Sequence, residues 1–143
     1  MKKLYTITIA AGLAVSLSGC FGPKVATAAD AYKMDAKSTC DVSKHGVEKV
    51  LAVAKLYNPI AVKNEVEFRR LNVKNSGYIS AIEKALKAKS KTVHLVGKKK
   101  KIQKMDINWA TQRSCTFAIR ALQQQNEAKS TWRMSVPGDG FKY

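Results

Sequence analysis

The sequence predicts a small single domain of the α+β class, in which three helices cover one face of a short, mainly antiparallel sheet. Three segments carry apolar residues at helical spacing, and shorter stretches between them carry apolar residues in alternation. Of the 143 residues, 45% are hydrophobic. This content suffices for a core in a domain of about 100 residues. The elements are expected in the order α-β-α-β-β-α, without an internal repeat.

The first helix is expected at residues 43–57, where four apolar residues form one stripe. Asp41 or Ser43 is a suitable N-terminal cap. Asn58 and Pro59 are expected to end the helix, because a residue that precedes proline avoids the helical region. The stripe consists of Val47, Val50, Leu51 and Ala54.

A strand is expected at residues 65–73, although its apolar residues change phase along the segment. A β-bulge near Arg69 and Arg70 would reconcile the two phases. The first phase contains Val66 and Phe68, and the second contains Leu71 and Val73.

A turn and a second helix are expected after this strand. Asn75-Ser76-Gly77 has the composition of a turn, and the helix is expected at residues 78–89. Ser80 followed by Glu83 is a candidate capping box, but an earlier helix start fits the sequence equally well. The buried stripe of this helix would consist of Tyr78, Ile82, Ala85 and Leu86.

Residues 91–109 predict a β-hairpin followed by a third helix. Val93 and Leu95 alternate before Gly97, and the run from Lys98 to Lys101 is expected near the tip. The returning strand would carry Met105, Ile107 and Trp109.

The third helix is expected at residues 110–128, with Asp106 as its cap or as a partner of the helix dipole. A Pro-Gly-Asp-Gly turn follows in the tail, where Trp132 is expected to pack back on the domain. The stripe of this helix contains Cys115, Ala118, Ile119 and Leu122.

The chain is strongly basic, with 26 Lys and Arg against 10 Asp and Glu and a formal net charge of +16. Such an imbalance favours anionic surroundings such as nucleic acid, lipid headgroups or acidic glycans, and otherwise gives a soluble, self-repelling surface. The lysine-rich hairpin is the candidate anion-binding site, and scarce aromatic residues argue against base stacking. Alternatively, these lysines keep the hairpin soluble and block edge pairing. The candidate residues are Lys98, Lys99, Lys100, Lys101, Lys104, Arg69 and Arg70, with Lys87, Lys89 and Lys91 as an extension.

The sequence contains none of the common catalytic motifs, so we expect a protein that is not an enzyme. His45 and His94 could each act as a general base, but neither has a partner that the sequence identifies. Two histidines and two cysteines at scattered positions lack the short paired spacings of zinc sites, so we expect no metal and no small-molecule cofactor. A periplasmic hydrolase remains a third possibility, because catalytic groups can converge from distant positions.

The N-terminus has the layout of a secretory signal, with Lys2 and Lys3 followed by an apolar run that is too short to span a membrane. The run ends in Leu17-Ser18-Gly19-Cys20, which resembles the lipobox of bacterial lipoproteins. The resemblance implies that residues 1–19 are removed and that Cys20 carries a covalent lipid. Because Phe21 and not Asp follows, the chain resembles lipoproteins of the outer membrane, with the domain on the periplasmic side.

Lipidation of Cys20 would leave Cys40 and Cys115, which we expect to form a disulfide in an oxidising compartment; the alternative is two reduced, buried cysteines. Residues 20–38 are expected to be a flexible tether, and residues 39–143 a basic periplasmic domain. Removal of Lys2 and Lys3 with the signal lowers the net charge by two, from +16 to +14.

These features together favour a lipid-anchored envelope protein that binds another envelope protein. An accessory subunit of a secretion, pilus or conjugation complex fits this description. The alternative is a binder of an anionic polymer, such as a glycolipid phosphate, peptidoglycan or DNA, through Lys98–Lys101.

Overall fold

The computed structural model describes residues 26–70, 72–96 and 102–131. It confirms a mixed architecture of helices and antiparallel strands, but the described residues form six helices where three were expected. The strands form two separate two-stranded sheets, β1–β2 and β3–β4, in place of one. The helices are α1 (Ala28–Tyr32), α2 (Ala36–Thr39), α3 (Val42–His45), α4 (Val47–Lys63), α5 (Asn75–Lys87) and α6 (Ile107–Thr131). The strands are β1 (Arg69–Arg70), β2 (Val73–Lys74), β3 (Thr92–Val96) and β4 (Ile102–Asp106).

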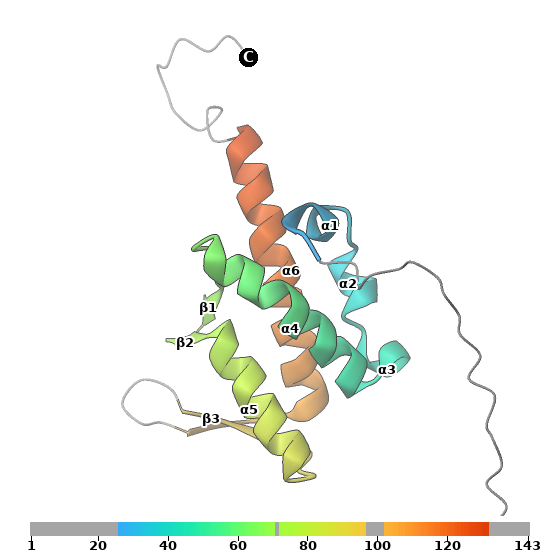
Figure 1. Ribbon diagram of the computed structural model, residues 1–143. Coiled ribbons are helices and arrows are strands. Elements are labelled where there is room, and N and C mark those ends of the chain that lie inside the picture. The colour runs from blue at the N-terminus through green and yellow to red at the C-terminus, as the bar shows by residue number, and fades with distance from the viewer. Residues whose placement is uncertain (1–25, 71, 97–101, 132–143) are drawn as a thin grey trace, which may run out of the picture.

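The 25-residue helix α6 is the central element, and the other helices pack around it (Figure 1). One core cluster joins α6 to the N-terminal helices and α4. A second cluster joins the start of α6 to α4, α5 and β3. The first cluster contains Ala31, Ala36, Cys40, Val42, Val50, Ala54, Tyr57, Ala61, Cys115, Ala118, Ile119, Ala121 and Leu122. The second contains Leu51, Tyr78, Ile82, Ala85, Val93, Leu95, Ile107 and Ala110.

The structure corrects the expected boundary between tether and domain, because residues 28–32 and 36–39 are helical and packed on α6. Thr27 and Asp30 form a capping box at the start of α1, and the Asp35 carboxylate caps α2. The side-chain amide of Gln123 in α6 donates to the carbonyl oxygens of Ala31 and Met34, at 3.0 and 2.7 Å. The flexible-tether prediction is therefore wrong for residues 26–38.

Helix α4 begins and ends later than the sequence suggests: residues 42–45 form the separate helix α3, and Pro59 lies inside α4 without ending it. Proline removes one helical hydrogen bond and crowds the carbonyl four residues before it. Both Pro59 and Lys55 are exposed, so that the Lys55 carbonyl can be hydrated. The continuation buries Ala61 and leaves the Asn58 side chain facing α5, where it bonds to Asn75.

One strand was expected at residues 65–73, but the structure has two short antiparallel strands, β1 and β2, which pair with each other. The predicted β-bulge is therefore wrong. Arg69 pairs with Lys74 and Arg70 with Val73, which places a chain reversal where the apolar phase changes. Asn72 lies within this reversal with a φ of 62°, a left-handed conformation that asparagine tolerates well.

Asn75-Ser76-Gly77 was expected to form a turn outside the helix, but it forms the first turn of α5. The earlier of the two possible helix starts is therefore the correct one. The Ser76 N–H donates to the Glu67 carboxylate at 2.7 Å, so that a residue from outside the helix satisfies this free amide. Gly77 is required for packing, because an added Cβ would lie 2.9 Å from Val73 Cγ1.

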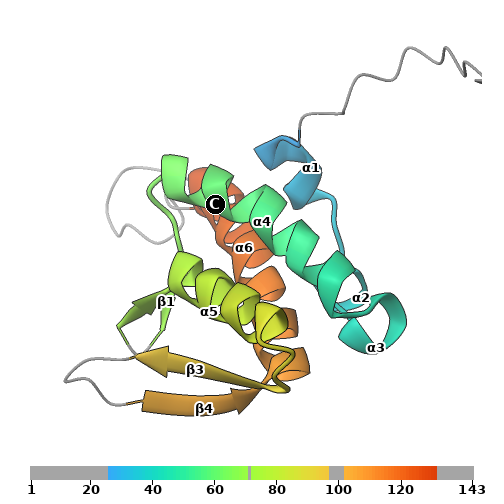
Figure 2. The same ribbon diagram turned by 60° about the horizontal axis from the view of Figure 1, so that its bottom comes forward.

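The predicted β3–β4 hairpin is confirmed, with Val93 opposite Met105 and Val96 opposite Ile102. Figure 2 shows it on the side of α5 that faces away from α4. Ile107 and Trp109 belong to α6 and not to the strand. As expected, Asp106 caps α6, and its carboxylate accepts hydrogen bonds from the N–H groups of Asn108 and Trp109. The lysines at 98–101 and Trp132 lie outside the described residues.

The predicted disulfide between Cys40 and Cys115 is confirmed. Both cysteines are fully buried, and their Cα atoms are 5.6 Å apart. The bond fastens the end of α2 to the middle of α6. No helix in the described part of the chain is long and apolar enough to cross a membrane.

Candidate binding surfaces

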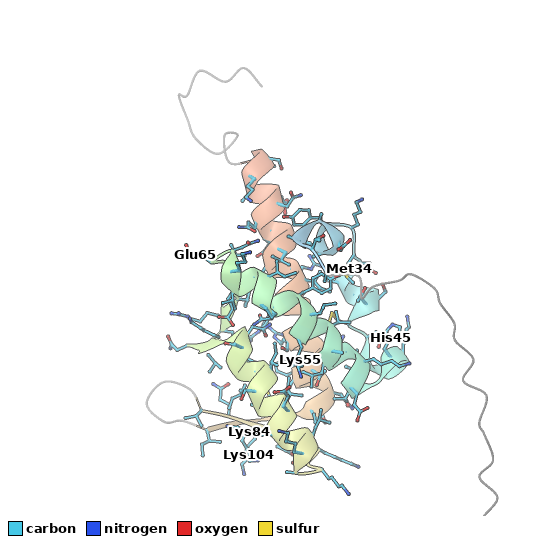
Figure 3. All side chains as sticks on the ribbon, in the orientation of Figure 1. Met34, His45, Lys55, Glu65, Lys84 and Lys104 are labelled. Atoms are coloured by element: carbon cyan, nitrogen blue, oxygen red, sulfur yellow. A yellow bond between two sulfur atoms is a disulfide. The ribbon has the colours of Figure 1, made fainter. Side chains whose placement is uncertain are left out.

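The end of α5 and the β3–β4 hairpin form a basic face. Lys84 and His94 line one hollow of about 350 Å³ between α5 and β3, and His94 lies opposite Lys104 in the hairpin register. All three side chains are exposed, and Figure 3 shows Lys84 and Lys104 at the same end of the molecule. The lysines at the end of α5 also compensate the negative end of its dipole. The remaining described lysines of this stretch are Lys87, Lys89 and Lys91.

The two carboxylates near this face each have a partner outside the lysines of the face. Glu83, the acidic residue of α5, forms an ion pair of 2.6 Å with Lys55 of α4. Asp106, the acidic residue in the described part of the hairpin, accepts the hydrogen bonds that cap α6. The exposed lysines of the basic face outnumber its carboxylates, and such an excess of positive charge attracts anions.

The two arginines lie in a different sheet from Lys104. Arg69 and Arg70 lie on β1, which pairs with β2 and not with the hairpin that carries Lys104. Arg69 lines a hollow of about 270 Å³ together with Glu65 and Glu67, so that carboxylates lie beside it. The described members of the predicted anion site thus lie on two separate sheets, and Lys98–Lys101 lie outside the described residues.

The two histidines lie on different surfaces and do not form a site together. His45 Nε2 is 3.2 Å from the Ser38 carbonyl oxygen, and His45 lines an open hollow with Lys44 and Lys49. His94 lies on the exposed face of β3. Among the described residues, no group of three or more His, Cys, Asp or Glu side chains is placed to hold a metal ion.

A column of aromatic and cationic side chains on α6 is a second surface, which the sequence interpretation did not identify. The Arg113 guanidinium lies 4.9 Å from the centre of the Trp109 ring and 5.2 Å from that of Phe117. Each such contact contributes about 0.5–2 kcal/mol. The spacing of four residues between these side chains is the signal that could have revealed the column.

The base of the column is held by two further rings. Phe68 stacks on Phe117 with a distance of 4.1 Å between ring centres, and Tyr78 meets Phe117 edge-on at 6.1 Å. Burial raises the pKa of the Tyr78 hydroxyl, and the nearby positive charge of Arg70 opposes part of this rise.

The column borders a shallow hollow of about 330 Å³. Trp109 at its rim is 44% exposed, and the Arg113 Nε is buried without a hydrogen-bond partner. The hollow is lined by Trp109, Gln112, Arg113, Thr116 and Phe117. No protein-family model, curated protein or solved structure matches the chain.

Proposed function

We propose that this protein is a lipid-anchored component of a bacterial cell envelope, with a binding role and no enzymatic activity. The observation that carries the proposal is Leu17-Ser18-Gly19-Cys20 at the end of a signal-like apolar run. The buried Cys40–Cys115 disulfide supports it, since such bonds persist in exported proteins and are rare in the cytosol.

The proposed role is to hold another envelope protein, as an accessory subunit of a secretion, pilus or conjugation complex. Two surfaces support a binding role, the basic face and the column on α6. Exposed tryptophan and arginine are the residue types that contribute most to protein–protein interfaces. Crosslinking in the envelope followed by affinity purification should recover a stable protein partner, and a chain that stays monomeric in the envelope would contradict this role.

Mass spectrometry of the chain expressed in a Gram-negative host tests the anchor. The expected mass corresponds to a chain that begins at Cys20 and carries acyl groups, and the Cys20→Ser variant should leave the membrane fraction. A free thiol on Cys20 in a host that acylates other lipoproteins would rule the anchor out.

A second candidate function is the binding of an anionic polymer through the lysine-rich hairpin. Two exposed lysines of the basic face, Lys84 and Lys104, favour it, because they add positive charge to that of the sequence run Lys98–Lys101. A lysine ammonium attracts an anion as a point charge, without the planar pair of hydrogen bonds that arginine makes. Binding through lysines should therefore weaken steeply as the salt concentration rises.

Replacing the four lysines at 98–101 with glutamine tests this function against a matched control. The control replaces four exposed lysines elsewhere, Lys33, Lys37, Lys63 and Lys129, and removes the same charge. Binding to phosphatidylglycerol vesicles and to a short DNA duplex should weaken and lose salt dependence with the hairpin variant only. Equal losses of binding in both variants would indicate that the net charge of the protein, and not a site on the hairpin, attracts the polymer.

A further inference from the structure

The Arg113 guanidinium is a partly buried cation without a counterion in the described structure. In the described part of the chain its guanidinium contacts the two aromatic rings, and its Nε has no hydrogen-bond partner. Removing a charged group from water is costly, and the two cation–π contacts offset part of this cost without giving Nε a hydrogen bond.

The surrounding side chains hold this cation in one orientation. Phe117 is only 8% exposed and is fixed by Phe68 and Tyr78. With the Trp109 and Phe117 rings beside the guanidinium and Nε buried, the terminal nitrogens are the groups left for a ligand. The end of a guanidinium binds a carboxylate with two parallel hydrogen bonds.

The rim of the hollow selects for an apolar neighbour beside that carboxylate. Trp109 exposes 44% of its surface next to Arg113, which is a large apolar area for a free surface. An acidic side chain on an apolar segment of another protein would satisfy both groups at once.

We propose that the Trp109–Arg113–Phe117 column is the docking point for an acidic, apolar segment of a partner protein. One carboxylate of that segment binds the terminal nitrogens of Arg113, and an apolar side chain covers Trp109. The inference rests on the proposed function, because it names the surface and the chemistry by which the envelope partner is held.

Site-specific photocrosslinking in the bacterium that encodes the chain tests the docking point. The photoreactive phenylalanine derivative p-benzoylphenylalanine replaces Gln112, which is exposed and lines the hollow. The matched control carries it at Lys49, an exposed position of α4 beside the His45 hollow. The full chain is used, with Cys20 and the disulfide intact. The expected result is a protein adduct from position 112 that is absent from position 49.

The chemistry of the contact is tested by charge. Arg113→Gln should lower the adduct about tenfold, and Arg113→Lys should restore it only in part because lysine lacks the planar fork. Arg120→Gln, an exposed arginine of the same helix, should leave the adduct unchanged. The crosslinked partner peptide should contain an acidic residue, and exchanging that residue for lysine together with Arg113→Glu should restore the adduct. An unchanged urea midpoint for the purified variants confirms that they fold.

Several results would overturn the docking point. These are an adduct that Arg113→Gln does not change, an adduct with lipid or glycan in place of protein, equal adducts from positions 112 and 49, and no adduct at all. Failure of the anchor is distinguishable from failure of docking. If the anchor fails, Cys20 carries a free thiol and the Arg113-dependent adduct still forms. If docking fails, Cys20 is acylated and no Arg113-dependent adduct forms.

Discussion

Asn75 is the residue on which the contact between three helices depends. Its fully buried amide donates to Asn58 Oδ1 at 2.9 Å and to the Ser114 carbonyl oxygen at 3.0 Å, and it accepts from the Ser114 hydroxyl at 3.0 Å. Asn58 in turn donates to the Glu67 carboxylate. These bonds join α4, α5 and α6 through polar groups that have no access to water, so that each group depends on the others.

Replacing Asn75 with alanine should therefore destabilise the protein by about 2–4 kcal/mol, because the partner groups on Asn58 and Ser114 stay buried without a hydrogen bond. Urea denaturation with the disulfide intact measures this change. The exposed Asn126 of α6 provides the control, and its replacement by alanine should change stability by less than about 0.5 kcal/mol. Equal effects at the two positions would show that the buried network contributes nothing.

Gly77→Ala should also destabilise the protein, although alanine favours helices by about 1 kcal/mol. The new Cβ would lie 2.9 Å from Val73 Cγ1, so that the Val73 side chain or the backbone that carries it has to shift. Shortening Val73 to alanine in the same chain removes the colliding methyl group. The double variant should then be more stable than Gly77→Ala alone in urea denaturation, and an additive loss would contradict the proposed collision.

These residues show why local sequence gave the wrong answer at positions 75–77. Asn-Ser-Gly is a common turn composition, and the signals that override it come from elsewhere in the chain. The Asn75 partners in α6 are 39 residues away, and the Glu67 carboxylate that binds the Ser76 N–H is nine residues away. The Arg113 column has a local signal in its four-residue spacing, but the rings at its base are not predictable locally, since Phe68 and Tyr78 reach it from distant segments.

At the scale of elements, Glu67 stabilises the start of α5 in a pH-dependent way. Burial by itself would raise the pKa of its carboxyl, but hydrogen bonds from Ser76 and Asn58 outweigh this and hold the pKa below its ordinary value of 4.5. A depressed pKa in the folded state stabilises the protein above about pH 4.5, and this contribution is lost as the pH falls through the folded value.

The melting temperature should accordingly fall between about pH 5 and pH 3, and Glu67→Gln should show a smaller fall. Part of the fall remains in the variant, because hydrogen bonds or ion pairs also lower the pKa values of three other carboxyl groups. These belong to Asp35, Asp41 and Glu83. Glu48→Gln, at an exposed carboxyl in the first turn of α4, is the control and should retain the full fall.

The longer elements were predictable and the shorter ones were not. α4, α5, α6 and the β3–β4 hairpin span enough residues for their apolar period to appear, and the predicted stripes are buried or partly buried. α1, α2 and α3 contain four or five residues each, which is little more than one turn. Such helices depend on caps and on contact with α6, so that their sequence resembles a linker.

At the scale of the whole molecule, the two core clusters divide the structure unequally. The second cluster contains no buried residue before Leu51, whereas the first depends on Ala31, Ala36 and Cys40 in the N-terminal segment. The Cys40–Cys115 bond is the covalent link between that segment and α6. The N-terminal helices should therefore form the least stable part of the domain once the link is removed.

Replacing both Cys40 and Cys115 with alanine should lower the free energy of unfolding by about 2–5 kcal/mol, since a bond across 75 positions restricts the unfolded chain strongly. Hydrogen exchange should show where the loss occurs. Amides of α1, α2 and α3 should exchange faster by a larger factor than those of α5 and the β3–β4 hairpin, whose core the bond does not reach. Dithiothreitol should reproduce this pattern in the wild-type chain and leave the alanine variant unchanged. Uniform loss of protection across all helices would show instead that the two clusters unfold as one unit.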